Sequence, residues 1–131
     1  MTATTSYVIA YEANCVGDVF SFNVESRFLP TQSWVKTQHI LERTSDRTLN
    51  HERTHFDLSE VQARKARQGL ASLKSPCALP DEERDALMVP YLKDDAGVQA
   101  QYDRETMNGT LPAEQGKWDE RVRQWLRDLP R

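Results

Sequence analysis

A long run without helix-breaking residues is the feature that most constrains the fold of this chain. No glycine or proline occurs from Ser45 to Gln68, and Ser45 or Asp46 can cap the start by accepting a free backbone N–H. The run therefore predicts one long helix that ends between Gly69 and Pro76. Apolar residues recur at every seventh position, namely Leu49, Phe56, Ala63 and Leu70. This stripe predicts that one side of the helix packs on the core.

The first half of the predicted helix carries the pattern H-E-x-x-H at His51, Glu52 and His55. Residues four apart lie on the same face, one turn apart, so both imidazoles can reach one ion. Zn²⁺ is commonly bound in this way, and Glu52 would lie close enough to a water at the metal to act as general base. The apolar stripe lies about 120–160° round the helix, so we expect the histidine face to border a cleft. The alternative is that these side chains are solvated surface residues.

Short strands are predicted ahead of this helix. Tyr7–Tyr11 and Val19–Val24 are rich in β-branched and aromatic residues, and Asn14–Asp18 between them is typical of a turn. The two runs predict an antiparallel hairpin, and Ser33–Val35 predicts a third short strand. The expected fold is α+β, with a small N-terminal antiparallel sheet followed by three or four helices. We expect a single domain over residues 1–131, with a β-rich part at 1–36 and a helical part at 45–131 that carries the metal site.

Proline and glycine divide the second half of the chain. A new helix is expected to start near Asp81, and Pro90 is expected to end or kink it. The segment Asp94–Met107 predicts a further helix, which Asn108–Gly109 ends. Large apolar residues at helical spacing predict the core-facing side of the last helix, namely Trp118, Val122, Trp125, Leu126 and Leu129.

Composition excludes two classes of partner. The net charge of −3 provides no basic surface for nucleic acid, and no run approaches the roughly eighteen apolar residues of a membrane span. The opening Met1–Ser6 lacks the charged and apolar regions of a signal peptide, which leaves a cytoplasmic location open. Cys15 and Cys77 are expected to be two separate buried thiols, or one bridge if the protein works in an oxidising compartment.

A catalytic zinc site usually has three protein ligands and one open position, so the histidine pair needs a third partner. Asp57 and Glu60 lie about 200° and 140° round the helix from the pair, which excludes both as ligands. His39 precedes the helix and stays open as a candidate. Better candidates lie in Gln101–Gly109, where an expected helix concentrates polar side chains near its end. The alternative for that segment is a solvated helix end.

The two polar segments together resemble a known family. Leu49–Glu60 is similar to the helix motif of the bacterial DUF922 family, and Tyr102–Gly109 is similar to its second motif, Y-D-x-x-T-x-H-G. Ser33–Val35 and Gln115–Trp118 also fit, so the resemblance covers most of the chain from Phe20 onward. Members are described as predicted secreted zinc-dependent proteases. The resemblance therefore implies a zincin-like fold, a Zn²⁺ cofactor, a peptide or protein substrate, and a secreted or periplasmic location.

The second motif supplies the remaining candidate residues. We expect Asp103 to be the third zinc ligand, with Glu105 the next choice. Tyr102 is expected to donate a hydrogen bond to the oxyanion that forms when the scissile carbonyl is attacked. One position departs from the motif, because Asn108 stands where the family has histidine, and asparagine is a poor zinc ligand.

The expected function is zinc-dependent hydrolysis of peptide bonds, with Glu52 as the general base. Two alternatives stay open. Asn108 favours a zincin-like module that has lost catalysis and binds a peptide or a partner protein. The other alternative is a structural domain that binds no metal. Metal content separates the last alternative from the first two, and turnover separates the peptidase from the binding module.

Overall fold

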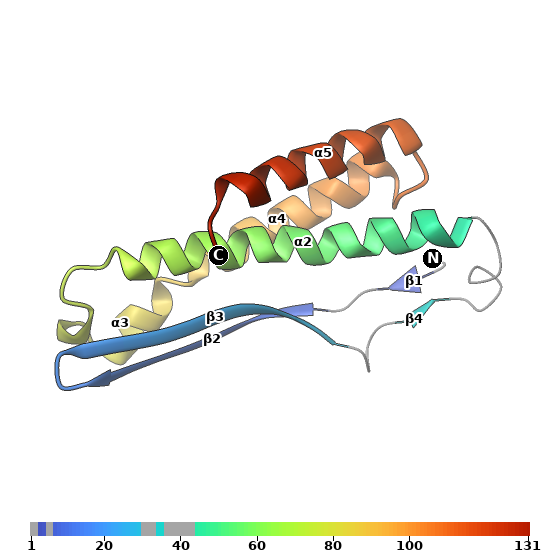
Figure 1. Ribbon diagram of the computed structural model, residues 1–131. Helices are drawn as coiled ribbons and strands as arrows, with labels where there is room; N and C mark the ends of the chain where they lie inside the picture. Colours follow the sequence, from blue (N-terminus) through green and yellow to red (C-terminus); the bar gives the residue numbers. More distant parts are fainter. Residues whose placement is uncertain (1–2, 5–6, 30–33, 36–43) are drawn as a thin grey trace.

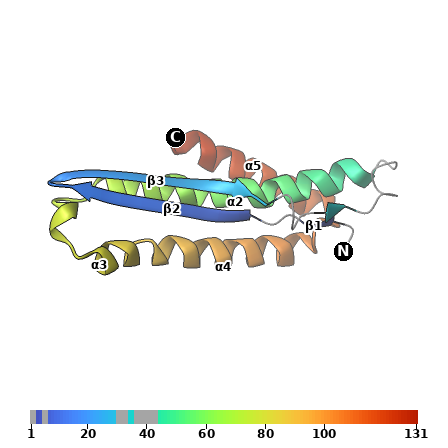
Figure 2. The same cartoon turned by 90° about the horizontal axis from the view of Figure 1, so that it is seen from below.

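One long helix runs through the middle of the molecule, and the other elements pack around it. The computed structural model describes residues 3–4, 7–29, 34–35 and 44–131. In Figure 1 the helix α2 (Thr44–Ala71) lies between a β-hairpin on one side and the helices α4 and α5 on the other. Figure 2 shows the hairpin lying along α2, with α3 and α4 below it and α5 above it in this view. This arrangement confirms the predicted α+β class.

Helix α2 confirms the prediction of an unbroken helix from Ser45 to Gln68. Its predicted apolar stripe is wrong at Leu49, whose exposed fraction is 49%, although Ala63 and Leu70 are buried. The reason is that the two halves of α2 bury different faces. The first half buries a polar face, which includes His51 and Thr54, and the second half buries an apolar one.

The hairpin consists of β2 (Tyr7–Val16) and β3 (Val19–Phe28), which pair antiparallel with Val16 opposite Val19. The hairpin prediction is confirmed, but the predicted turn is too long, because Asn14–Val16 continues the first strand. A two-residue turn is sufficient here since Gly17 adopts a positive φ of 61°. Tight hairpin turns require this backbone conformation, which glycine adopts without steric cost.

The hairpin packs on the second half of α2 and forms one of two cores. The buried members of this core are Val24, Ala63, Ala66, Leu70 and Met88. The small alanine side chains allow the sheet to lie close to the helix. Arg67 of α2 adds a polar link, since its Nε donates to the backbone oxygen of Val24 at 2.6 Å.

A second, smaller pair of strands lies beside the start of α2. β1 (Ala3–Thr4) pairs antiparallel with β4 (Trp34–Val35), as Figure 1 shows. The strand predicted at Ser33–Val35 is confirmed at Trp34–Val35, whereas β1 was not predicted. The candidate ligand His39 lies outside the described residues.

Three further helices and a short 3-10 turn complete the chain. The turn η2 (Pro76–Ala78) leads to α3 (Asp81–Ala86), α4 (Val89–Thr106) and α5 (Pro112–Asp128). The helix that begins at Asp81 ends at Ala86, a few residues before the predicted break at Pro90, and Pro90 itself lies in the first turn of α4. A proline there costs no hydrogen bond, since the first helical N–H groups have no intrahelical partner. Helix α4 therefore starts five residues before the predicted Asp94.

The second core joins α2, α4 and α5. Its buried members are Leu58, Tyr102, Trp118 and Val122. Trp125 and Leu126 pack against it and are partly buried, as the spacing of large apolar residues in the last helix predicts. Within the described ranges, none of the helices combines the length and apolar character that a membrane span requires.

A disulfide joins Cys15 of β2 to Cys77 of η2, with a Cα–Cα distance of 5.8 Å. Of the two states considered for these cysteines, the structure has the bridge. It links the tip of the hairpin to the segment that follows α2, and it closes a loop with a sequence separation of 62 residues. The bridge therefore holds the hairpin against the far end of α2.

Removal of the bridge tests how much it stabilises the fold. Replacing both cysteines with alanine should lower the free energy of unfolding by about 4 kcal/mol, because the unfolded chain regains the entropy of an open loop of this length. Urea unfolding of the double variant and of the unreduced parent protein measures the difference. Two free thiols in the denatured, unreduced parent protein, or equal stability of the two proteins, would contradict the expectation.

Candidate metal centre

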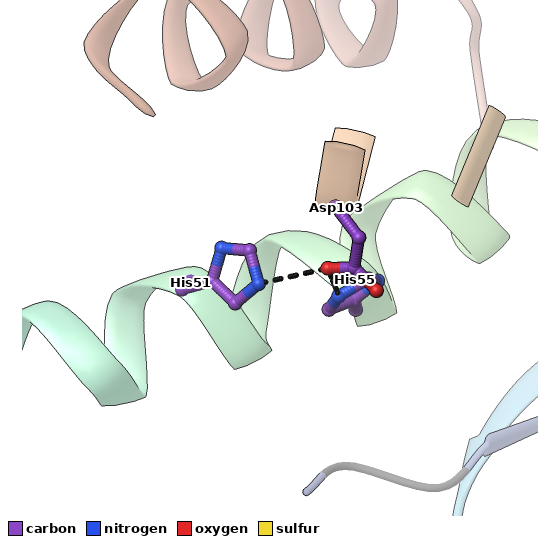
Figure 3. Close-up of side chains that lie close together, drawn as sticks. All are labelled: His51, His55 and Asp103. Carbon is purple, nitrogen blue, oxygen red and sulfur yellow. Dashed lines mark hydrogen bonds and ion pairs between the residues drawn. The ribbon is translucent and has the colours of Figure 1, made fainter. Parts of the chain in front are cut away.

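Three side chains from two helices converge on one point. Helix α2 supplies His51 and His55 from successive turns, and α4 packs against them and supplies Asp103 (Figure 3). The Asp103 Oδ1 lies 3.0 Å from His51 Nε2 and 2.7 Å from His55 Nε2. The three atoms lie within 4.8 Å of one another. The structure thus brings together the three residues that the sequence nominates as metal ligands.

The chemistry of these three atoms fits a cation. The Nε2 of a neutral imidazole with its proton on Nδ1 is an acceptor, and an ionised carboxylate also only accepts. Acceptors that face one another repel unless positive charge lies between them, either as protons on the rings or as a metal ion. Two histidine nitrogens and one carboxylate oxygen form a usual ligand set for catalytic Zn²⁺.

The distances from the carboxylate oxygen to the two imidazole nitrogens are also close to those between zinc ligands. Ligands at about 2.0–2.1 Å from a tetrahedral zinc lie about 3.3 Å from each other. The distances from Asp103 Oδ1 to the two Nε2 atoms, 2.7 and 3.0 Å, are shorter by a few tenths of an ångström. Both side chains of the histidine pair are buried, whereas the Asp103 side chain is 41% exposed. The carboxylate can therefore withdraw slightly to admit an ion.

The second nitrogen of each imidazole faces a glutamine. His51 Nδ1 lies 2.8 Å from Oε1 of Gln115 on α5, and His55 Nδ1 lies 2.5 Å from Oε1 of Gln99 on α4. Both glutamines are buried. Sequence reasoning missed Gln99, although its place one turn before Asp103 on α4 puts it on nearly the same helix face. Gln115 entered only as part of a resemblance and received no role.

Tyr102 forms the wall of the site. Its ring stacks on His51 with a centroid distance of 4.6 Å, and it meets the edge of His55 at 4.8 Å. The hydroxyl is completely buried and donates to the backbone oxygen of His51 at 3.0 Å. Burial raises the pKa of Tyr102 well above its usual value, so the phenol stays protonated. The predicted oxyanion role stays a prediction, and it would require this hydrogen to leave the His51 carbonyl.

The turn between α4 and α5 supports the ring of His51. Gly109 has a φ of 86°, and a Cβ added there would lie 2.8 Å from Cγ of His51. Any other residue at position 109 would therefore collide with the imidazole. The preceding Asn108 is exposed and also left-handed, with a φ of 56°. Asparagine adopts this conformation more readily than most residues, which gives Asn108 a role in the backbone of the turn.

The two glutamates that the sequence nominates lie apart from this cluster. Glu52 is partly buried and follows His51 on α2, and among the described residues it has no hydrogen-bond or ion-pair partner. Glu105, the second choice for the third ligand, accepts from Trp118 Nε1 at 3.1 Å and from Gln101 Nε2 at 2.6 Å. The hydrogen bond from Gln101 is the main cause that lowers the pKa of Glu105. Glu105 therefore faces α5 and does not join the ligand cluster.

A comparison with known families places the chain. The sequence model of the DUF922 family, described as bacterial protein of unknown function, matches residues 1–109. The chain belongs to this family. The matched region contains His51, Glu52, His55 and Asp103, whereas α5 with Gln115 lies beyond it. No curated protein and no solved structure matches the chain.

The ligand assignment predicts an order of zinc affinities. His51→Ala and His55→Ala should each abolish tight zinc binding, because two remaining ligands cannot hold a catalytic site. Asp103→Ala should weaken the affinity more than Glu105→Ala, since only the Asp103 carboxylate faces the histidines. Competition with a chromophoric chelator measures the four affinities. An unchanged stoichiometry in either histidine variant would place the metal elsewhere, and the reverse order for the two acidic residues would overturn the third ligand.

Proposed function

We propose that this member of the DUF922 family is a zinc-dependent peptidase, with His51, His55 and Asp103 as zinc ligands and Glu52 as general base. The observation that carries the proposal is the convergence of three acceptor atoms, with Oδ1 of Asp103 2.7 and 3.0 Å from the two Nε2 atoms. Burial of the two imidazoles and their hydrogen bonds to glutamine support it, since metal-binding histidines usually donate their other N–H to a fixed acceptor.

The residue beside the first ligand supports hydrolysis as the reaction. Glu52 lies about 100° round α2 from His51, so it stands next to the site but outside the ligand cluster. Its carboxylate has no partner among the described residues, which leaves it free to accept a proton. A carboxylate in this position is the general base of enzymes with the H-E-x-x-H pattern.

The division of labour in the reaction follows from these positions. Zn²⁺, when bound, acts as a Lewis acid that lowers the pKa of water to about 7 and polarises a carbonyl. Glu52 takes a proton from the attacking water as the water oxygen bonds to the scissile carbonyl carbon. The same carboxyl group then gives this proton to the leaving nitrogen as the C–N bond breaks. The buried imidazoles and Tyr102 keep water away from the back of the site.

The disulfide supports a location outside the cytoplasm. Bridges persist in secreted and periplasmic proteins, whereas cytosolic thiols are kept reduced. The Cys15–Cys77 bridge therefore favours a secreted or periplasmic peptidase. The substrate in such a compartment would be a peptide or a protein.

A second candidate function is a binding module without catalysis. Asn108 favours it, because it replaces the histidine of the family's second motif and is exposed on the α4–α5 turn. In this version the same cluster binds a metal or a peptide end but turns over no substrate. Turnover by the zinc-loaded protein decides between the two candidates.

The proposed role of Glu52 predicts a separation of binding from catalysis. Glu52→Gln should keep the zinc content and the fold, because neither a ligand nor a core residue changes. Peptide hydrolysis should fall by roughly 10²–10⁴-fold, which is the usual contribution of a general base. The assay is digestion of a mixed pool of unfolded proteins, followed by mass spectrometry of the products.

A matched control is Glu120→Gln, which removes an exposed carboxylate of α5 that pairs with Arg123 and should leave hydrolysis unchanged. Equal cleavage by the parent protein and Glu52→Gln would show that the proposed base is wrong. A zinc-loaded parent protein that cleaves nothing in the pool would instead support the binding module.

A further inference from the structure

We propose that Gln99 and Gln115 are the positioning residues of the metal centre, and that each fixes one imidazole with its proton on Nδ1. In this tautomer the Nε2 lone pairs of His51 and His55 both point at the ion. The inference rests on the proposed metal site and extends it to residues that never touch the metal. The tautomer of each imidazole depends on which way the glutamine amide is turned, and the neighbours of each amide settle that direction.

The amide of Gln99 can have only one orientation. Its Nε2 donates to the backbone oxygen of His55 at 2.8 Å and to Oδ1 of Asp95 at 3.1 Å. Both partners are acceptors, so the NH₂ group must face them. Oε1 then faces the ring of His55 at 2.5 Å. Since a carbonyl oxygen cannot donate, His55 Nδ1 must carry the proton.

The amide of Gln115 is fixed in the same way. Its Nε2 donates to Oδ1 of Asp119 at 2.8 Å and to the hydroxyl oxygen of Tyr102 at 2.6 Å. The Tyr102 hydroxyl uses its own hydrogen on the backbone oxygen of His51, so it can only accept from the amide. Oε1 therefore faces His51 Nδ1 at 2.8 Å, which must be the donor.

A carboxylate one helical turn away holds each amide. Asp119 is itself anchored by α2, because Asn50 donates to its Oδ2 at 2.8 Å and Thr54 lies 3.0 Å from its Oδ1. Asp95 is partly buried, and this burial raises the pKa of its carboxyl group although the hydrogen bond from Gln99 opposes the rise. The centre thus contains two parallel chains, Asp95–Gln99–His55 and Asp119–Gln115–His51.

Each glutamine also holds the main chain of its histidine. Gln99 bonds directly to the backbone oxygen of His55, and Gln115 reaches the backbone oxygen of His51 through Tyr102. Both ends of each histidine are therefore fixed by one amide. Turning either ring would break its hydrogen bond from Nδ1 to the glutamine oxygen, so the ligands are set before an ion arrives.

Asp103 favours the other tautomer of each ring, because its carboxylate would accept a hydrogen bond from a proton on Nε2. Its side chain is 41% exposed and can exchange its contacts for water at low cost. The two glutamines are only 8% exposed, and their oxygens would be left without a donor inside the protein. An unsatisfied buried acceptor costs about 1–3 kcal/mol. The amides, and not Asp103, therefore determine which nitrogen of each ring carries the proton.

Long-range ¹H–¹⁵N NMR of the metal-free protein, at a pH where the imidazoles are neutral, reads the tautomer of each ring directly. The parent protein should show His51 and His55 with the proton on Nδ1. Gln115→Met keeps the length of the side chain but removes the acceptor. In this variant the proton of His51 alone should no longer be fixed on Nδ1. In Gln99→Met the proton of His55 alone should no longer be fixed on Nδ1. A general structural disturbance would affect both rings in both variants.

Two other glutamines provide matched controls. Gln101 and Gln124 also donate to a carboxylate four residues later, Glu105 at 2.6 Å and Asp128 at 2.8 Å. Both are exposed on α4 and α5, and within the described part of the chain neither bonds to a histidine. Gln101→Met and Gln124→Met should therefore leave both tautomers unchanged.

Zinc affinity gives a second readout that needs no turnover. Gln99→Met and Gln115→Met should each weaken zinc binding by about 10- to 100-fold, and the two controls should not. A parent protein with the proton on Nε2 of either ring would overturn the proposal, and this result is available even if the variants fail to fold. Affinities equal to those of the controls would overturn it as well. Correct tautomers in a protein without peptidase activity would leave the positioning role standing and reject only the proposed reaction.

Discussion

The fold depends on the burial of two imidazoles on one face of α2. A buried polar group is costly unless it has a hydrogen-bond partner, so His51 and His55 dictate what can pack on them. This requirement accounts for the amides that α4 and α5 present at the interface, where ordinary amphipathic helices would carry leucine. Gly109 follows from the same constraint, because the chain must turn in direct contact with the ring of His51.

The molecule divides its tasks along this helix. The second half of α2 packs on the hairpin through alanine and leucine, and the Cys15–Cys77 bridge ties the hairpin tip to the segment after α2. The first half carries the polar cluster and relies on α4 and α5 for its partners. Apolar packing at one end of α2 thus supports a polar network at the other end. In that network each buried polar group needs a hydrogen-bond partner or an opposite charge.

The features that the sequence predicted correctly are those that lie within a single structural element. The unbroken helix, the hairpin and the pairing of His51 with His55 depend on local spacing, and Asp103 was nominated from a cluster of polar residues on one helix together with the resemblance to a family motif. The partners that bridge elements gave no such signal. Gln99 and Gln115 are indistinguishable from solvated residues until the helices are placed together, and their roles come only from packing. The same limit explains why the predicted apolar stripe is wrong at Leu49. The buried face of α2 changes along the helix, because different elements pack on its two halves.

The proposed role of this cluster is to hold one zinc ion. The most direct test is the metal content of the complete, unreduced chain after equilibration with Zn²⁺ and removal of unbound metal, measured by elemental mass spectrometry. About one zinc per chain is expected, as a single site with three protein ligands requires. A protein that retains no zinc under these conditions would contradict it.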